Sequence, residues 1–379
     1  MEQTGIASPR SNVEGAGKQC FRYANKGQYS VDSSKSITIG KRTISAFGPA
    51  YVIAEIGVNH NGSVDLAHRM IDEAAAAGAD AVKFQTFVTG ELVLPSAMQA
   101  AYQSAAVGER CQADMLRELE LTFAEFTALR DHCGAAGVDF MSTAFDPASL
   151  DFVIGLGPSC LKWPSGELTN WPLLRQAAAS GLPLLLSTGM ASIREIAGAL
   201  EQVRDAEVCI LQCVSNYPAR IEDQNLRTLP ALAAAFGRPV GFSDHTNGPF
   251  AAIAARALGM CVLEKHFTLD RRMVGPDHAA STEPSEFADL VRLLRQIEAG
   301  LGDGVKRPLP REEDVKAVAR KSLVYRTDLP SGHVLRAQDM TAKRPASGIA
   351  PDCADMVLGL ELARGVARDE MFAFAHVAG

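Results

Sequence analysis

Eight short apolar segments recur between residues 52 and 269, and they constrain the fold more than any other feature of the sequence. They read VIAEIG, AVKFQT, DFMSTAF, CLKWPSG, LPLLLSTG, VCILQCVS, PVGFSDHT and CVLEKHFTL. Helix-like stretches separate them at 64–77, 123–136, 171–179, 193–203, 226–236, 250–258 and 285–299. Continuous apolar strands that alternate with helices predict a parallel sheet, and eight repeats favour a closed (β/α)8 TIM barrel over an open, doubly wound sheet.

Composition and charge set limits on the partners of the chain. The 379 residues leave room for a barrel of roughly 250 residues and a smaller domain. The 37 basic and 44 acidic residues give a net charge of −7 without a basic stripe, so we expect no nucleic-acid partner. Apolar runs far shorter than ~20 residues and an N-terminus without a secretory signal predict no membrane association and a cytoplasmic location. The eight cysteines form no CxxC pair, which predicts reduced, structural thiols.

Composition shifts along the chain divide it into four parts. They are a tail at 1–35 that is predicted to be disordered, a barrel domain at 36–301, a Pro- and charge-rich linker at 302–319, and a small β domain at 320–379. Residues 36–50 alternate apolar and polar side chains around glycines, which predicts a hairpin that covers the bottom of the barrel. The segment after 320 has short strands and tight turns with almost no helical period.

Polar side chains stand at the carboxyl ends of the first two strands. In a parallel barrel these ends converge on the active site. Glu55 lies inside an apolar strand, where a carboxylate is costly without a role, and it could move protons. Lys83 and Gln85 share one face of the second strand. A lysine that faces into a barrel is rarely structural, and both phosphate binding and a Schiff base remain open for it.

Later strands repeat this pattern with cations and hydroxyl groups. The fourth strand ends in Lys162, Ser165 and Glu167, and the next three strands end in Ser187, Ser215 and Ser243. Hydroxyls and backbone N–H groups in such turns suit a phosphate, whereas capping of the following helix is the alternative for any single serine. The convergence of the whole set favours an anion site.

Two histidines end the last two strands, His245 the seventh and His266 the eighth. Adjacent barrel strands would bring their imidazoles close together, which suits a divalent transition metal. Because only two nitrogen ligands are evident, substrate and water would complete the coordination, as in a catalytic rather than a structural site. The alternative is a pair of core histidines with ordinary hydrogen bonds.

Eleven strings together resemble the sialic acid synthase family of nonulosonate synthases over about residues 36–375. In order they are AEIGVNHNG, GADAVKFQTF, LELTFAEF, FMSTAFD, KWPSGELTNWPLL, LLSTGMAS, CVSNYPA, VGFSDHT, LEKHFTLD, GPDHAAS and AKRPASGI. The resemblance implies a TIM barrel with a C-terminal antifreeze-like (SAF) domain, and a domain-swapped homodimer in which that domain covers the partner's active site. It also implies a transferase that condenses phosphoenolpyruvate with an N-acetylated amino-sugar aldehyde, giving a nine-carbon 2-keto acid and phosphate.

The resemblance further implies a role for individual residues. Phosphoenolpyruvate would be held by Lys83, Thr143, Lys162, Ser165, Ser187, Ser215 and Ser243, and the sugar by Gln85, Tyr217, Asp277 and Arg344. Glu55 and Glu167 would be acid/base groups beside Lys83, and His245 and His266 would bind Mn²⁺, with Mg²⁺ or Co²⁺ as alternatives. Trp163, Pro164 and Ala346 depart from the usual pattern of the family and could reshape the sugar pocket.

The identity of the acceptor sugar remains open at the level of sequence, because the discriminating contacts are expected from loops, including 95–115, that sequence alone does not position. N-acetylmannosamine, which would give N-acetylneuraminate, is favoured over its 6-phosphate. Synthesis of N,N'-diacetyllegionaminate from 2,4-diacetamido-2,4,6-trideoxymannose is the alternative. Two other readings are a Schiff-base aldolase that uses Lys83, Lys162 or Lys265, and a noncatalytic phosphosugar-binding protein.

Overall fold

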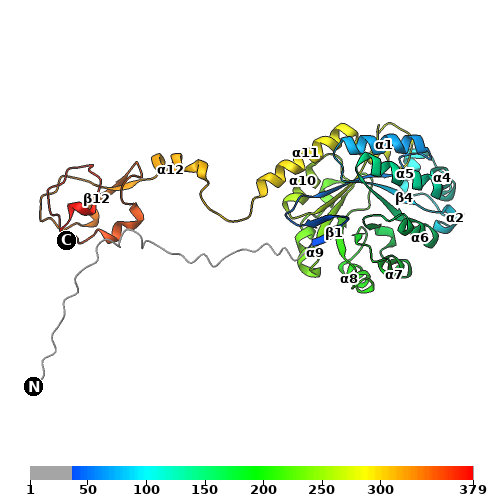
Figure 1. Ribbon diagram of the computed structural model, residues 1–379, viewed down its shortest axis with the longest axis horizontal. Helices are drawn as coiled ribbons and strands as arrows, with labels where there is room; N and C mark the ends of the chain where they lie inside the picture. The colour runs from blue at the N-terminus through cyan, green and yellow to red at the C-terminus, as the bar shows by residue number, and fades with distance from the viewer. Residues whose placement is uncertain (1–35, 379) are drawn as a thin grey trace, which may run out of the picture. The chain divides into compact units, whose positions relative to one another are not determined.

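The computed structural model describes residues 36–378, which fall into two compact units, 36–303 and 304–378 (Figure 1). The predicted tail at 1–35 lies outside the described residues. Within the part of the chain that is described, no helix has both the length and the apolar character needed to cross a bilayer.

The larger unit is built on a ring of eight parallel strands, which confirms the predicted barrel. The strands are β3 (Tyr51–Gly57), β4 (Ala81–Thr86), β5 (Asp139–Ala144), β6 (Leu161–Trp163), β7 (Leu184–Ser187), β8 (Val208–Cys213), β9 (Val240–Asp244) and β10 (Val262–His266). Their hydrogen-bonded order is β5-β4-β3-β10-β9-β8-β7-β6. The two ends of this order, β5 and β6, lie side by side, so the ring is nearly closed.

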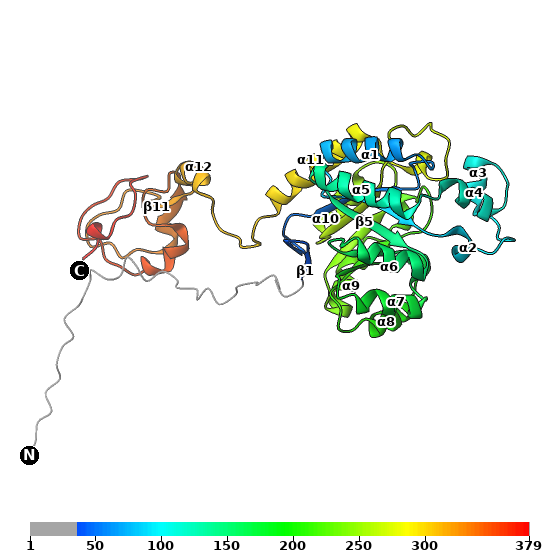
Figure 2. The same ribbon diagram turned by 45° about the vertical axis from the view of Figure 1, so that its right-hand side comes forward.

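Helices cover the outside of the ring (Figure 2). They are α1 (Val64–Ala76), α5 (Phe123–Ala136), α6 (Pro147–Gly155), α7 (Trp171–Ala179), α8 (Ile193–Gln202), α9 (Thr228–Phe236), α10 (Phe250–Ala257) and α11 (Pro284–Leu301). Local sequence sets several of their ends. Thr122 and Glu125 form a capping box before α5, and Gly137 ends that helix in the left-handed conformation that glycine tolerates. Helix α6, which the helical period did not predict, begins at Asp146, whose carboxylate accepts the Ser149 N–H.

A hairpin covers the bottom of the barrel interior, as the sequence predicts. Strands β1 (Ser36–Ile39) and β2 (Arg42–Ser45) pair antiparallel. Ile37, Ile39 and Ile44 of this hairpin are buried against inward-facing barrel residues in one apolar cluster, whose other members are Tyr51, Ile53, Ala81, Met141, Cys160, Leu185, Cys209, Leu211, Cys261 and Val262. The amino-terminal end of the barrel is therefore filled by apolar side chains.

An insertion between β4 and β5 stands at the opposite, carboxyl end of the strands. It contains α2 (Thr89–Leu92), α3 (Ala101–Val107) and α4 (Gln112–Leu119). Three α4 side chains, Met115, Leu116 and Leu119, pack with Val58 and Phe87 in a separate apolar cluster. This cluster fixes α4 at the rim of the barrel.

The smaller unit contains few regular elements. Helix α12 (Glu313–Ala319) occupies part of the stretch that the sequence predicts as a linker. Strands β11 (Ser322–Tyr325) and β12 (Met340–Lys343) pair antiparallel. Its core is formed by Leu323, Tyr325, Leu329, Leu335, Met340, Val357, Leu362, Val366 and Phe372. Isolated bridges and short 3₁₀ turns connect the rest, as the absence of a helical period predicts.

Candidate active site

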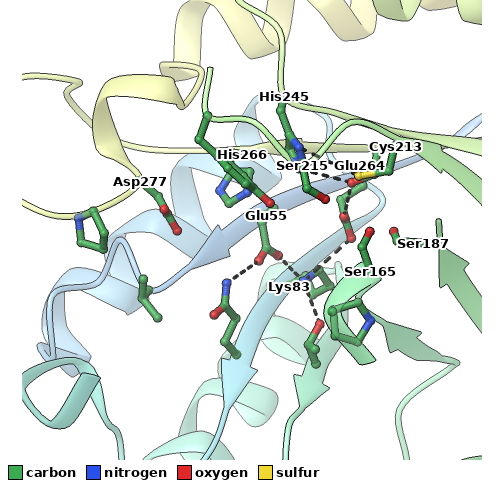
Figure 3. A pocket seen from close by; sticks show the side chains of 18 of the residues that line it. Glu55, Lys83, Ser165, Ser187, Cys213, Ser215, His245, Glu264, His266 and Asp277 are labelled. Atoms are coloured by element: carbon green, nitrogen blue, oxygen red, sulfur yellow. Dashed lines mark hydrogen bonds and ion pairs between the residues drawn. The ribbon is translucent and has the colours of Figure 1, made fainter. Parts of the chain in front are cut away.

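A cavity of about 290 Å³ opens among the carboxyl ends of the barrel strands (Figure 3). Most of the site residues that the sequence predicts line it. They are Glu55, Lys83, Gln85, Thr143, Lys162, Ser165, Ser187, Ser215, Tyr217, Ser243, His245, His266 and Asp277. The parallel register explains this convergence, since each strand delivers its last inward-facing residues to the same end of the ring.

Two lysines and two carboxylates form a buried ion-pair network at the floor of the cavity. Lys83 Nζ lies 2.8 Å from Glu55 Oε2 and 3.8 Å from Glu264 Oε2, and Lys162 Nζ lies 3.4 Å from Glu264 Oε1. Lys83 also donates to Thr143 Oγ1 at 3.0 Å, and the Ser243 hydroxyl donates to Glu264 Oε1 at 2.8 Å. Glu264 thus joins both cations.

Burial and these contacts shift the protonation of the network. Desolvation raises the pKa of Glu55 to about 7, although Lys83 opposes the shift. Desolvation also acts to raise the pKa of Glu264, but Lys162 and Lys83 outweigh it and hold that pKa at about 2. Burial lowers the pKa of Lys162, whereas the two carboxylates outweigh burial at Lys83 and raise its pKa. Near neutral pH, Lys83 therefore faces one ionised carboxylate, Glu264, and one that is partly protonated, Glu55, while burial favours the neutral form of Lys162.

Hydroxyl groups surround this cationic floor on the β6–β9 side of the ring. The Ser187 hydroxyl is buried without a hydrogen-bond partner among the described residues. The Gly189 N–H donates to Ser165 Oγ at 2.8 Å. A Cβ atom at Gly189 would lie 2.2 Å from Ser215 Oγ, so only glycine lets these hydroxyls converge. Such a group of buried donors suits an oxyanion.

A second glycine keeps space at the end of β3. Gly57 has a φ of +56° at a bulge in the ladder between β3 and β4. A Cβ there would lie 3.0 Å from Glu55 Oε1 and 3.1 Å from Gln85 Nε2. The glycine therefore allows Gln85 to approach Glu55, to which its amide donates at 3.4 Å.

The two histidines meet as the sequence predicts. The ring centroids of His245 and His266 are 5.4 Å apart, and the ring of Tyr217 lies 4.2 Å from His245 and 5.5 Å from His266. Burial, strengthened by His245, holds the pKa of His266 well below its usual value. Burial also acts to lower the pKa of His245, but Cys213 and the Val214 carbonyl outweigh it and raise that pKa.

The imidazole pair could supply two of the nitrogen ligands that a metal ion needs. His245 Nδ1 donates to the Val214 carbonyl at 2.7 Å, which orients the ring, and His266 Nδ1 is buried without a hydrogen-bond partner in the described structure. Within residues 36–378, no group of three or more His, Cys, Asp or Glu side chains is arranged around a common metal position. A metal here would have two protein nitrogens and an otherwise open coordination sphere.

Three residues with predicted roles do not line the cavity. The Glu167 carboxylate accepts a hydrogen bond from the Asn170 side chain at 2.7 Å, at the start of α7. Arg344 belongs to the smaller unit and donates to the Ala319 carbonyl. Lys265, one of the three Schiff-base candidates, points away from the cavity and pairs with Asp244 at 2.7 Å.

The departures from the family pattern lie in different surroundings. Trp163 is fully buried between the barrel and its helices, and its indole donates to the Glu167 carbonyl at 2.8 Å. Pro164 lines the cavity. Ala346 is exposed in the smaller unit, where its N–H donates to the Ala317 carbonyl.

Several lining residues escaped the sequence analysis. Glu264 could have been found, because it stands two residues before His266 on one strand and must share its face. Cys213, predicted to be structural, lines the cavity with its sulfur 4.0 Å from His245 Nδ1. The insertion contributes Tyr102 and the α4 side chains; the sequence predicts discriminating contacts from loops that include 95–115, but it marks no individual residue there.

Asp277, a predicted sugar contact, is the remaining carboxylate of the lining. Burial raises its pKa to about 6.

Comparison with known proteins identifies related chains for both units. The NeuB family model matches residues 70–306, and the SAF domain model matches residues 320–378. The N,N'-diacetyllegionaminic acid synthase of Legionella pneumophila is 40% identical over 335 residues, which cover 86% of this chain and 94% of that protein. The N-acetylneuraminate-9-phosphate synthase of Mus musculus is 35% identical and covers 80% of this chain, with 85% of its own length matched.

A solved structure agrees with this fold. The N-acetylneuraminic acid synthetase of Leptospira borgpetersenii, in complex with citrate, is 35% identical with a TM-score of 0.66. The match covers 74% of this chain and 95% of that one.

Proposed function

Since this chain belongs to the NeuB family of phosphoenolpyruvate-dependent nonulosonate synthases, with a SAF domain after the barrel, we propose that the cavity at the strand ends is its condensation site. The observation that carries the proposal is the pair of buried lysines, Lys83 and Lys162, in one cavity with the Ser187 hydroxyl, which has no hydrogen-bond partner among the described residues. Together with the other hydroxyls they provide charge and donors for the phosphate and carboxylate of phosphoenolpyruvate.

The proposed reaction forms one carbon–carbon bond and breaks one carbon–oxygen bond. C3 of phosphoenolpyruvate attacks the aldehyde carbon of the sugar, whose oxygen takes up a proton. Water then adds to C2, and inorganic phosphate leaves with its bridging oxygen. Glu55 is the proposed acid/base group, because its pKa near 7 lets it both give and accept a proton. Glu167 remains a second proposal, but its contact with Asn170 does not support an acid/base role.

A divalent metal is also part of the proposal. His245 and His266 would hold Mn²⁺ or a similar ion such as Mg²⁺ or Co²⁺, because their rings lie together and the His266 Nδ1 atom has no hydrogen-bond partner within residues 36–378. When bound, such an ion acts as a Lewis acid toward the sugar aldehyde.

For the acceptor, we propose an unphosphorylated N-acetylated sugar. Lys83 and Lys162 are the only lysines or arginines among the described residues that line the cavity, and both serve the proposed phosphoenolpyruvate site. A sugar phosphate would need a further cation, which the described lining does not provide; Arg344, proposed below as a sugar contact, belongs to the smaller unit and would have to serve that phosphate. The sequence alone favours N-acetylmannosamine, but the 40% identical relative bears the name of a legionaminic acid synthase. We therefore favour 2,4-diacetamido-2,4,6-trideoxymannose, and keep N-acetylmannosamine as the second candidate because of the 35% identical Leptospira structure.

Phosphate release against a panel of sugars tests this choice. The purified chain, phosphoenolpyruvate and Mn²⁺ would be mixed with the diacetamido sugar, N-acetylmannosamine or N-acetylmannosamine 6-phosphate. We expect kcat/KM to be highest for the diacetamido sugar. A preference for the 6-phosphate would contradict the proposed acceptor class, and loss of turnover should follow chelation of the metal.

The role of Arg344 as a sugar contact, the domain-swapped homodimer and the cytoplasmic location are proposals that rest on the sequence and the family resemblance. The first two can be tested together by mixing Arg344→Ala chains with Lys83→Ala chains. If the SAF domain serves the partner's barrel, a mixed dimer keeps one intact site, and activity recovers. No recovery despite proven subunit exchange would contradict exchange of this domain.

A further inference from the structure

The lining of the cavity differs between two arcs of the barrel ring. Ser165, Ser187, Ser215 and Ser243 come from the β6–β9 arc. Pro164 and Met190 add apolar atoms on that arc. The β3–β5 arc contributes Glu55, Lys83, Gln85 and Thr143, and with its insertion it also contributes five apolar lining residues, which we call the apolar wall. They are Val58, Met115, Leu116, Leu119 and Phe145.

The apolar wall is held in place by residues that lie outside the lining of the cavity. Met115, Leu116 and Leu119 lie on one face of α4 and are nearly fully buried. They pack with Phe87, Leu92 and Val93, which belong to the same cluster but do not line the cavity. This packing fixes the position of the apolar wall, and the side of the wall that lines the cavity can contact a ligand.

An aromatic stack joins the insertion to the reaction centre. Tyr102 of α3 lines the cavity and stacks on Tyr217 with ring centroids 5.0 Å apart. Tyr217 lies in turn 4.2 Å from the ring of His245. The insertion therefore borders the position where the sugar aldehyde would react, rather than a remote part of the surface.

The chemistry of the wall restricts which part of a substrate it can hold. Phosphoenolpyruvate carries two anionic groups, which gain nothing from an apolar surface that cannot donate hydrogen bonds. An N-acetylated sugar carries acetamido methyl groups, and a 6-deoxy sugar has a further methyl at C6. Burying such groups against Met and Leu side chains is favourable, whereas burying a sugar hydroxyl there without a partner is not.

We propose that the apolar wall is a methyl-binding subsite that selects acceptors with a C4 acetamido group and a C6 methyl over those with hydroxyls at these carbons. This inference rests on the proposed function and names the residues that set its acceptor specificity. Met115, Leu116 and Leu119 are its central determinants, because all three line the cavity from α4, and Met115 and Leu119 are the two chosen for the test.

The test compares two acceptors in each variant. Met115→Gln keeps the side-chain length but adds polar atoms, and Leu119→Ala removes methyl groups without adding any. For each, kcat/KM would be measured with 2,4-diacetamido-2,4,6-trideoxymannose and with N-acetylmannosamine. One methyl group in an apolar pocket changes discrimination by about 10- to 200-fold. We expect the ratio of the two values to fall at least about 10-fold in Met115→Gln, and by less in Leu119→Ala.

Val93→Thr is the matched control, because it makes an isosteric polar change in the same cluster away from the cavity. We expect its ratio to equal that of the wild type. Calorimetry would measure the binding of phosphoenolpyruvate, and binding as in the wild type would show that each variant keeps the ion-pair network at the floor of the cavity intact. A purely structural role would lower kcat/KM for both sugars alike and leave their ratio unchanged.

The outcomes separate the two proposals. If the wild type condenses phosphoenolpyruvate but all ratios stay equal, or if it prefers N-acetylmannosamine, the methyl subsite is overturned and the synthase assignment stands. The same holds if neither wall variant retains phosphoenolpyruvate binding, because the wall is then structural. If the wild type condenses neither sugar with phosphoenolpyruvate, the proposed acceptor fails and the subsite fails with it.

Discussion

The two ends of the barrel interior are built from the same strands but have opposite chemistry. On β7, Leu185 belongs to the apolar cluster at the bottom, and Ser187, two residues later on the same face, lines the cavity. On β8, Cys209 and Cys213 show the same division. A few residues along one strand therefore separate side chains that stabilise the barrel from those proposed to act on substrate.

Each end has its own energetic character. The bottom buries apolar side chains, which is favourable by itself. The top buries two lysines and two carboxylates, whose mutual attraction must offset a large desolvation cost. The charged end is thus placed where function requires it, on a scaffold that the apolar end stabilises.

The largest expected effect comes from removing a cation at the top. Lys83→Met should lower kcat/KM for phosphate release by a factor on the order of 10²–10³, the size found when one preorganised charge-stabilising donor is lost. It would also leave Glu55 without its 2.8 Å partner. Lys41→Met, at an exposed lysine of the bottom hairpin, is the control and should leave kcat/KM unchanged. Equal losses of kcat/KM in both variants would contradict the assignment of catalysis to the carboxyl end of the barrel alone.

A substitution at the bottom should do the reverse. Leu185→Ala should lower the free energy of unfolding by about 2–5 kcal/mol, because it opens a cavity in a fully buried cluster. The kcat/KM of the folded fraction should remain near that of the wild type. Both tryptophans of the chain, Trp163 and Trp171, lie in the barrel, so tryptophan fluorescence, excited selectively over tyrosine, follows this unit alone in denaturant. A large loss of kcat/KM at full stability would contradict the comparison.

A smaller, pH-dependent effect should distinguish Glu55. Its folded pKa of about 7 lies above the ordinary value of 4.5 for a glutamate, so the folded barrel retains a proton that the unfolded chain releases. The contribution of Glu55 to the free energy of unfolding is fully present below its ordinary pKa of 4.5 and is lost as pH rises through its folded pKa of about 7. Glu55→Gln cannot titrate. Relative to the wild type, its free energy of unfolding should therefore rise between about pH 5 and about pH 8, as measured by fluorescence in denaturant, and a constant difference would refute the assigned shift.

The sequence predicted the top of the barrel better than its rim. Strand-end residues such as Lys83 and His266 were found because a short apolar run followed by polar residues has a defined direction in a parallel barrel. The sequence predicts Glu167 at the site because it follows the fourth strand and matches the family motif, whereas a 3₁₀ turn after β6 directs its carboxylate to Asn170. Loop geometry of this kind is not encoded in strand periodicity.

The apolar wall could not be predicted for a different reason. Met115 and Leu119 look like ordinary core residues of a short helix, and their period is the same whether they face a core or a cavity. Only the packing of α4 beside Phe145 shows that this face lines the site. The helix at Glu313–Ala319 was missed because its charged, Pro-preceded sequence also suits a linker.

One measurement tests most directly whether the charged end of the barrel condenses phosphoenolpyruvate as proposed. The chain would be supplied with the diacetamido sugar and phosphoenolpyruvate labelled with ¹⁸O at the bridging oxygen, and both products would be analysed by mass spectrometry. Attack of water at C2 predicts that the label appears in inorganic phosphate beside a nine-carbon 2-keto acid. Label retained in the keto acid, or phosphate released without that acid, would contradict the account.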